Sequence, residues 1–329
     1  MDDNIFWNNA VNITSGLVMN NGNLNYKDIG QGRIGDCYFL AALAAVATIP
    51  SRYDSILVNK EFPTSGVAAA IVRIRGSRWL VTVDNQLAFN SSSKPQFSSG
   101  RGNQGWVQFL EKMFAKVNVN YDNIVAGDVL EAVDWLTGFP GFSFSLTYPT
   151  GDVSTYISAW NFISAEIAKK SVMTLQTARG EGKNADGIVF NHAYSIVGAR
   201  TLTYNGKTYY LLRLYNPWRF DYFYTGAFND NDPIWQQGSP KNKDVLGYSP
   251  DVLDGIQYID AANLYSYFVR LTVSHDMTGY VESLAKVYDD PDNSDKYFTF
   301  KVTQNSTVYI KAFMYNQKMY PEDCVQNGV

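Results

Sequence analysis

The stretch Gly35 to Pro50, GDCYFLAALAAVATIP, is the most informative part of the chain. It is rich in alanine and leucine and apolar nearly all round, which predicts a buried helix that ends before Pro50. Asp36, a residue type that favours the N-cap position, comes directly before Cys37. A cysteine at a helix start lies at the positive end of the helix dipole, which favours a thiolate over a thiol. The alternative is a small buried hydrophobe, because free cysteine is among the most buried residue types.

The composition is that of a folded protein with a small excess of acidic groups. The chain has 329 residues, of which 46% are hydrophobic and 18% charged, and a net charge of −4. This length predicts two domains, and the negative charge argues against a nucleic-acid partner, which usually requires a concentrated basic face. The two cysteines, Cys37 and Cys324, are too few for a disulfide framework and are typical of a reducing compartment.

No segment of the sequence predicts insertion into a membrane. The longest apolar run is shorter than the roughly 18 residues that a spanning helix requires. The acidic N-terminus, MDDNIFWNNA, lacks the charged-then-apolar plan of a signal peptide. We therefore expect a cytoplasmic protein with no integral membrane segment.

Helical patterns dominate the first half of the chain. Apolar residues at i, i+3, i+4 spacing predict an amphipathic helix over residues 106–117, and further helices are expected at 128–136 and 154–170. Two β-rich stretches, 68–74 and 79–87, are separated by a short turn and predict a hairpin.

Strand patterns dominate after residue 171. Strands are expected at 171–178, 191–204 and 207–218, and Asn205-Gly206 between the last two is a strong hairpin signal. An α+β fold follows, with a helical first half and an antiparallel β-rich second half. Residues 296–315 alternate as two further strands, which predicts a short β extension or an incomplete β-sandwich at the C-terminus.

His192 and Asn216 are the candidates to act together with Cys37. Cysteine first, then histidine and asparagine well downstream, is the chain order of papain-like thiol proteases. Regular pairing about Asn205-Gly206 sets Asn216 opposite Ser195, so a β-bulge is needed to bring it to His192. An asparagine carbonyl at that position would hold the imidazole in the tautomer and orientation of a base. Taken singly, His192 is equally explained as a polar residue at a strand end, and Asn216 as a turn residue before proline.

Three blocks of sequence closely resemble the motifs of the calpain family of cysteine proteases. Gln31 to Ala42, QGRIGDCYFLAA, is similar to the calpain cysteine motif; Asn191 to Ser195, NHAYS, is similar to its histidine motif; and Leu212 to Trp218, LRLYNPW, is similar to its asparagine motif. They occur in calpain order, and weaker likenesses extend the match over residues 25–275. The resemblance implies a papain-like protease core in two subdomains with the active site in the cleft between them.

The resemblance also implies how the chain is divided and what its site residues do. The first subdomain would be residues 1–142 with the cysteine helix, the second residues 143–278 with the histidine and asparagine, and residues 279–329 the C-terminal extension. Gln31 looks like the oxyanion donor, working with the backbone N–H of Cys37. Trp218 resembles the tryptophan that shields the histidine–asparagine bond from water, and a core aromatic is the alternative. His275, the other histidine, is expected to be structural.

Calcium is the cofactor that the resemblance implies, because calpains bind calcium in the protease core, where the ions align the two subdomains. The candidate ligands are four aspartates, two in each subdomain: Asp28, Asp134, Asp230 and Asp254. In the second subdomain Phe223 and Ile256 stand where acidic ligands are expected, and calcium prefers six to eight oxygens, so that site should bind weakly or not at all. Scattered surface aspartates are the alternative. Arg219 also replaces the glycine that usually follows Asn-Pro-Trp.

The leading hypothesis is therefore a calpain-like cysteine endopeptidase that acts on protein substrates through a Cys37–His192–Asn216 triad and a thioester acyl-enzyme. A transglutaminase is a second enzyme class with a catalytic thiol, but Asn216 in the third position and the Gln31 block favour hydrolysis. The non-enzyme alternative is a calpain-fold binding module with a misaligned cleft, which the depleted second calcium site suggests.

Overall fold

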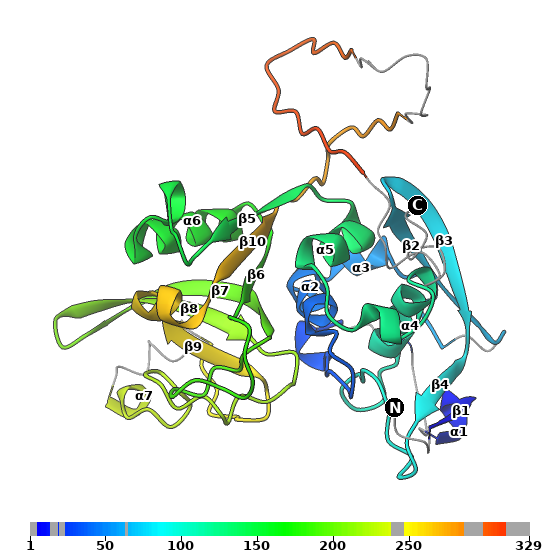
Figure 1. Cartoon of the computed structure of the whole chain (residues 1–329), viewed down its shortest axis with the longest axis horizontal. Helices are drawn as coiled ribbons and strands as arrows, with labels where there is room; N and C mark the ends of the chain where they lie inside the picture. Colours follow the sequence, from blue (N-terminus) through cyan, green and yellow to red (C-terminus); the bar gives the residue numbers. More distant parts are fainter. Residues whose placement is uncertain are drawn as a thin grey trace.

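The computed structural model has two halves that lie side by side (Figure 1). It describes most of the chain, namely residues 5–13, 19, 24–62, 65–237, 247–285 and 299–313. The first half is built around the cysteine helix and the second around a six-stranded sheet. Both predicted halves, and with them the α+β class, are confirmed.

In the first half a central helix is covered by other helices and by short antiparallel strand pairs. The helices are α1 (Ala10–Ile13), α2 (Cys37–Ala47), α3 (Ser51–Asp54), α4 (Trp106–Val117) and α5 (Val129–Thr137), with 3-10 turns η1 (Tyr26–Asp28) and η2 (Asp122–Ile124). The strand pairs are β2 (Val67–Ile74) with β3 (Ser77–Asp84), and β1 (Phe6–Asn9) with β4 (Gln86–Phe89). The predicted hairpin therefore forms, but its second stretch is divided between β3 and β4.

Helix α2 is buried along its whole length beyond Cys37. Its residue Phe39 stacks on Phe114 of α4 at a ring-centroid distance of 4.2 Å and meets Trp135 of α5 edge-on. An apolar helix without a polar face can only be stable when other elements cover it on all sides. The second half supplies that remaining cover, because α2 also packs against β6 and β7.

The second half is an antiparallel sheet with the strand order β5-β10-β6-β7-β8-β9. Its strands are β5 (Gly141–Ser145), β6 (Val172–Gln176), β7 (Ala193–Tyr204), β8 (Lys207–Tyr215), β9 (Ile256–Asp260) and β10 (Arg270–Ser274). Helix α6 (Tyr156–Ala168) packs on the sheet. The other described elements of this half are the 3-10 turns η3 (Gly151–Val153) and η4 (Ala261–Asn263) and the short helices α7 (Ile234–Gln237) and α9 (Leu264–Tyr267). The predicted boundary at residue 142 falls within β5, which pairs with β10 of this sheet.

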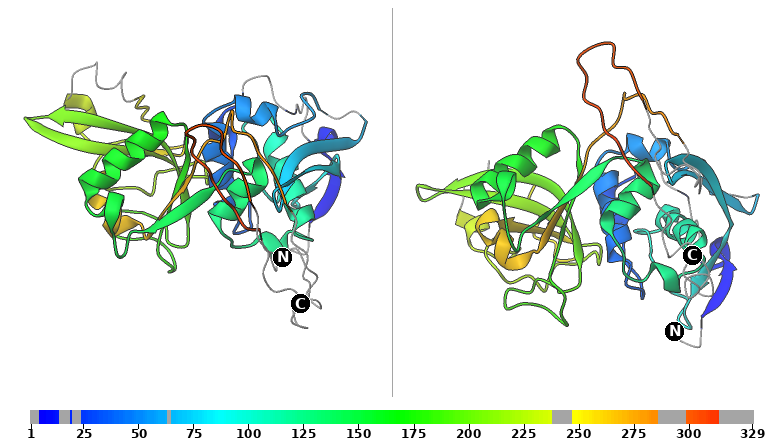
Figure 2. Two further views of the ribbon diagram at one scale, coloured as in Figure 1. Left: turned by 90° about the horizontal axis from the view of Figure 1, so that it is seen from above. Right: turned by 45° about the horizontal axis from the view of Figure 1, so that its top comes forward.

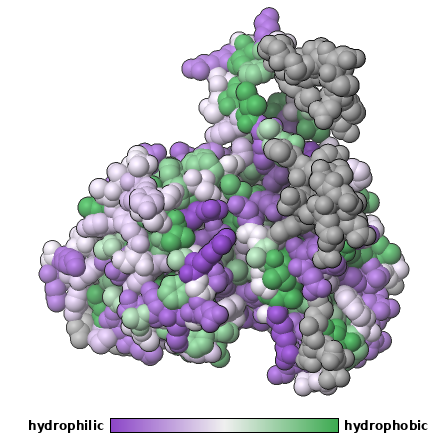
Figure 3. All heavy atoms as spheres, viewed as in Figure 1, coloured by the Kyte–Doolittle hydropathy of each residue, from purple (hydrophilic) through white to green (hydrophobic). Residues whose placement is uncertain are grey.

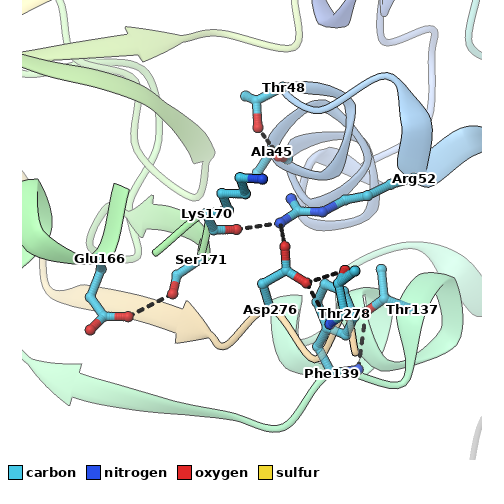
Figure 4. A network of polar contacts seen from close by, with 10 residues as sticks. All are labelled: Ala45, Thr48, Arg52, Thr137, Phe139, Glu166, Lys170, Ser171, Asp276 and Thr278. Carbon is cyan, nitrogen blue, oxygen red and sulfur yellow. Dashed lines mark hydrogen bonds and ion pairs between the residues drawn. The ribbon is translucent and has the colours of Figure 1, made fainter. Parts of the chain in front are cut away.

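Buried polar contacts join the halves near the middle of α2 and beyond its C-terminal end. Near its middle, Ser195 of β7 donates to the main-chain oxygen of Ala41 at 2.7 Å. Beyond its C-terminal end, the guanidinium of Arg52 points between the main-chain oxygen of Lys170 and the carboxylate of Asp276, 2.8 Å from the latter (Figure 4). Both the arginine and the carboxylate side chains are nearly inaccessible to solvent, so breaking this ion pair would leave an uncompensated buried charge.

The predicted C-terminal strands are not present in the described residues 279–285 and 299–313, which contain neither helix nor strand. This segment leaves the body after β10 and returns toward the first half (Figure 2). Its apolar residues Val281, Phe300 and Ile310 are exposed, and apolar surface gathers on the projecting part in Figure 3. Alternation alone does not make a strand, because two isolated strands without a sheet or helix to pack on are marginally stable at best.

The described residues contain no helix long and apolar enough to cross a membrane. Cys324 lies outside the described residues.

Replacing Phe39 by alanine should lower the free energy of unfolding by about 3–5 kcal/mol, because a large ring is removed from a fully buried site between two other rings. Urea unfolding followed by tryptophan fluorescence measures this change. The control is Tyr148→Ala, since that side chain is 80% exposed and should change stability by less than about 0.5 kcal/mol. Equal effects of the two substitutions would contradict the central position of α2.

Candidate active site

Cys37 is the first residue of α2 and lies half-buried where the two halves meet. Its Sγ donates to the main-chain oxygen of Asn191 at 3.8 Å, a residue of the second half that directly precedes His192. The sequence thus correctly predicts that the cysteine begins a helix and faces the histidine segment. In the described part of the chain, however, Sγ makes no hydrogen bond to the imidazole of His192.

Asp36 holds the N-cap position but its side chain does not cap the helix, contrary to the prediction. It is buried with Glu111 of α4, whose two oxygens accept the backbone N–H of Ser98 at 3.0 Å. Burial raises the pKa of Asp36 to about 7. Burial, reinforced by the negative charge of Asp36, raises the pKa of Glu111 well above its usual range. A buried pair of carboxyls this close retains a proton near neutral pH, since two charges cannot both be accommodated there.

Burial also decides the charge of Cys37. The lost hydration of the thiolate raises the pKa of the thiol to about 11, and the backbone N–H of Ala193, followed by those at the helix start, lowers it by less. The nearby Asp36 raises it further. The predicted thiolate is therefore not the resting form here, because desolvation outweighs the favourable end of the helix.

His192 and Asn216 form the bond that the sequence predicts. Nε2 of the buried imidazole lies 2.8 Å from Oδ1 of Asn216. The asparagine amide is held by two more bonds, since Nδ2 donates to Phe220 O at 3.0 Å and Oδ1 accepts the N–H of Trp218 at 3.0 Å. With Oδ1 turned to the ring, Nε2 carries the proton and Nδ1 is the basic nitrogen. Burial lowers the pKa of His192 to about 4, although the bond to Asn216 acts in the opposite direction.

The β-bulge required by the register is present. Strands β7 and β8 pair regularly from the turn up to Gly198 and Arg213, and the register shifts by one residue between Ile196 and Gly198. Beyond the shift Ser195 pairs with Tyr215. Asn216, the next residue, is thereby moved one position toward His192, which is what the side-chain bond needs.

Gln31 and Trp218 both lie at this junction. The backbone N–H of Gln31 donates to Pro217 O at 2.8 Å, which ties the glutamine loop to the end of β8. Its side-chain Nε2 donates to Ile34 O at 2.7 Å, and an amide nitrogen carries a second N–H that remains for another acceptor. The ring of Trp218 packs on the imidazole of His192 with a centroid distance of 4.6 Å.

The four candidate calcium ligands do not meet at one point, although Asp254 lies near enough to Asp230 to raise the pKa of that carboxyl. Asp134 is ion-paired with Lys311, and Asp254 is ion-paired with Lys27 at 2.7 Å. Asp28 is buried, with its carboxylate accepting the backbone N–H of Asn25. Among the residues that the structure describes, no three histidine, cysteine or acidic side chains come together as a metal site. Calcium needs six to eight oxygens around one point, so this arrangement does not fit the ion.

Asp230 lies beside a further buried aspartate, Asp221, which the sequence did not single out. Burial and the neighbouring carboxylates raise the pKa of Asp221 to about 8 and that of Asp230 to about 7. Each has one buried oxygen without a hydrogen-bond partner. His275, the other histidine, lies away from Cys37 with Nδ1 3.2 Å from Glu166, in keeping with a structural role.

Two halves with a cysteine helix at their junction and a histidine–asparagine bond facing it have the architecture of a papain-like cysteine protease core. The chain belongs to the calpain family, because the family model for calpain family cysteine proteases matches residues 1–275.

Similar proteins carry calpain names. The chain is 27% identical over 306 residues to a calpain-type cysteine protease DEK1 of Zea mays, covering 88% of this chain and 14% of that protein. It is 27% identical over 279 residues to a calpain of Schistosoma mansoni and 29% identical over 252 residues to human calpain-14, covering 83% and 75% of this chain. It spans only 36% and 35% of those two proteins.

The thiol pKa of about 11 predicts that alkylation of Cys37 by iodoacetamide is slow at pH 7 and accelerates between about pH 9 and 11. A raised pKa means that less thiolate, the reactive form, is present at neutral pH. Peptide mass spectrometry measures the rate, with glutathione in the same tube as the reference thiol. Alkylation of Cys37 that is faster than that of glutathione below pH 7 would contradict the dominance of burial.

Proposed function

We propose that the chain is a cysteine endopeptidase that hydrolyses peptide bonds of protein substrates with Cys37 as nucleophile, His192 as base and Asn216 as the residue that orients the base. The observation that carries the proposal is the 2.8 Å bond between His192 and Asn216, formed at the junction where Cys37 begins α2. Membership in a family of cysteine proteases supports it. A cytoplasmic location suits a thiol nucleophile, since a reducing compartment keeps the thiol free.

The proposed reaction starts from two neutral groups, since a thiol with a pKa of about 11 and an imidazole with a pKa of about 4 are both uncharged at pH 7. Nδ1 of His192 takes the thiol proton as Sγ attacks the substrate carbonyl carbon. The S–C bond forms, and the carbonyl electron pair moves to oxygen. The backbone N–H of Cys37 and the remaining amide N–H of Gln31 would stabilise that oxyanion.

The second half of the reaction returns the enzyme to its starting state. The C–N bond breaks, and the imidazolium gives its proton to the leaving amine, which yields a thioester. Water, deprotonated by His192, then attacks the thioester, and the thiol leaves with the proton. Trp218 would limit the access of water to the His192–Asn216 bond, on which its ring is packed.

A binding module is the second candidate, and one observation favours it. The bond of Cys37 Sγ goes to the Asn191 carbonyl and not to the imidazole, so the nucleophile and base are not yet paired. Catalysis therefore requires Sγ to leave that carbonyl when substrate enters, and apo sites often have such loose geometry. Calcium regulation stays a prediction from the family resemblance, without support from the arrangement of the four aspartates.

Cys37→Ala should abolish cleavage of an unfolded protein substrate such as casein, because the acyl-enzyme can no longer form. Asn216→Ala should retain activity reduced by about 10-fold to 100-fold, since it orients the base without transferring a proton. The measurement is kcat/KM on a fluorescent casein.

The matched control is Asn59→Ala, an asparagine whose amide also holds main-chain groups, Ala69 N and Val67 O, but within the first half. It should keep full activity. Casein cleavage that survives in Cys37→Ala would eliminate the proposed nucleophile, and a folded wild-type chain without any cleavage would favour the binding module.

A further inference from the structure

Arg219 reaches from the second half into the first. It follows the end of β8, and its Nη2 donates to the main-chain oxygens of Asp28 and Ser99, each at 2.6 Å. The hydroxyl of Ser99 lies 3.4 Å from the same nitrogen. All of these acceptors belong to the first half, so one guanidinium binds two of its loops. These contacts of Arg219 with Asp28 and Ser99 are called the clasp below.

The backbone at Arg219 is in a conformation that suits glycine better. Its φ is +67°, in the left-handed region that residues with a side chain rarely adopt. On the other side of the contact, Gly30 leaves room for the guanidinium, because a Cβ there would lie 2.4 Å from Nη2. The strain at Arg219 is thus offset by bonds that only a long cationic side chain over a glycine can make.

A second cationic side chain, that of Lys27, reaches from the first half to the second. Lys27 lies in η1 beside Asp28, and its Nζ is 2.7 Å from the carboxylate of Asp254 in the second half. The Asp254 side chain is only 5% exposed. In the short turn η1, Asp28 therefore binds a guanidinium of the second half, and Lys27 binds a carboxylate of the second half.

These cations lie at two of the predicted calcium-ligand positions. The main-chain oxygen of Asp28 and the carboxylate of Asp254 are oxygens of the kind that calcium prefers, yet they bind a guanidinium and an ammonium group. The arginine also sits close to the catalytic groups, because its backbone N–H donates to Asn216 O at 2.9 Å. Fixing Arg219 against Asp28 and Ser99 therefore holds the end of β8, with Asn216, against the loop that leads to Gln31 and Cys37.

We propose that Arg219, together with Lys27, aligns the two halves of the site in this chain, at ligand positions of the two calcium sites that the family resemblance implies. Arg219 is then a positioning residue, and its effect on turnover rests on the proposed peptidase function. The alignment of the two halves does not rest on that function, so it can be tested by a measurement other than catalytic activity.

The test uses the whole chain with Arg219→Gly, which relaxes the backbone and removes the clasp, and Arg219→Lys, which keeps one charged donor. Lys112→Met is the control, because Lys112 binds Asp84 and Gln86 within the first half alone. Thermal unfolding is measured in EDTA and in 2 mM CaCl₂. We expect Arg219→Gly to lower Tm by roughly 4–8 °C, Arg219→Lys to lower it by less, and calcium to leave the wild-type Tm unchanged.

Three results would overturn the proposal. They are a wild-type Tm that rises with calcium, an Arg219→Gly chain as stable as the wild type, or a loss no larger than that of Lys112→Met. None of them depends on catalysis, so a failure of the proposed function, in which wild type and Cys37→Ala are equally inactive, is distinguishable from a failure of the clasp.

Gly30→Ala provides a second measurement should Arg219→Gly fail to fold. The new methyl group would displace the guanidinium of Arg219 from its acceptors, although the arginine keeps its charge. Tm should therefore fall as in Arg219→Gly. With activity as readout in EDTA at 20 °C, where the variants are folded, kcat should fall about 10-fold or more with little change in KM. An unchanged Tm and kcat in Gly30→Ala would contradict the clasp.

Discussion

The burial of α2 between the two halves is the constraint on which the rest of the structure depends. The helix has no polar face, so the first half covers it with α4 and α5, and β6 and β7 of the second half cover what remains. Each half therefore completes the core of the other. The same packing brings the start of the helix, with Cys37, to the start of β7 and the end of β8, where His192 and Asn216 lie.

This burial has a chemical consequence. The imidazole of His192 is buried and the thiol of Cys37 is half-buried, and both lose hydration that their charged forms require. In the proposed mechanism the resting pair is neutral, and charge develops only when the sulfur attacks a substrate carbonyl. In such a site catalysis depends on how accurately the two halves hold the sulfur and the imidazole relative to each other. A rigid link between the halves near Asn216 would therefore offset the free-energy cost of the left-handed backbone conformation at Arg219.

Much of this arrangement could be predicted from the sequence, because it depends on local patterns. The alanine-rich run after Cys37 predicts a buried helix, and Asn205-Gly206 predicts the hairpin of β7 and β8. Counting residues from that turn predicts the need for a bulge before His192, and the register shift is present there.

The remaining features depend on contacts between distant residues. Whether Asp36 caps its helix or lies buried with Glu111 depends on how α4 packs. The replacement of a glycine by Arg219 was visible in the sequence, but its acceptors, Asp28 O and Ser99 O, come together only in the folded chain. Alternation in the C-terminal segment suggested strands, but in its described residues no strand pairs with it.

The most direct test of a peptidase site held together by its own side chains is the reaction of the intact chain with a peptidyl epoxide in the presence of EDTA, followed by mass spectrometry of the peptides. We expect one adduct, on the sulfur of Cys37, that forms in the folded chain without calcium and is lost when His192 is replaced by alanine. No adduct in the folded chain, or an adduct that forms only after calcium is added, would contradict a peptidase site that its own side chains hold together.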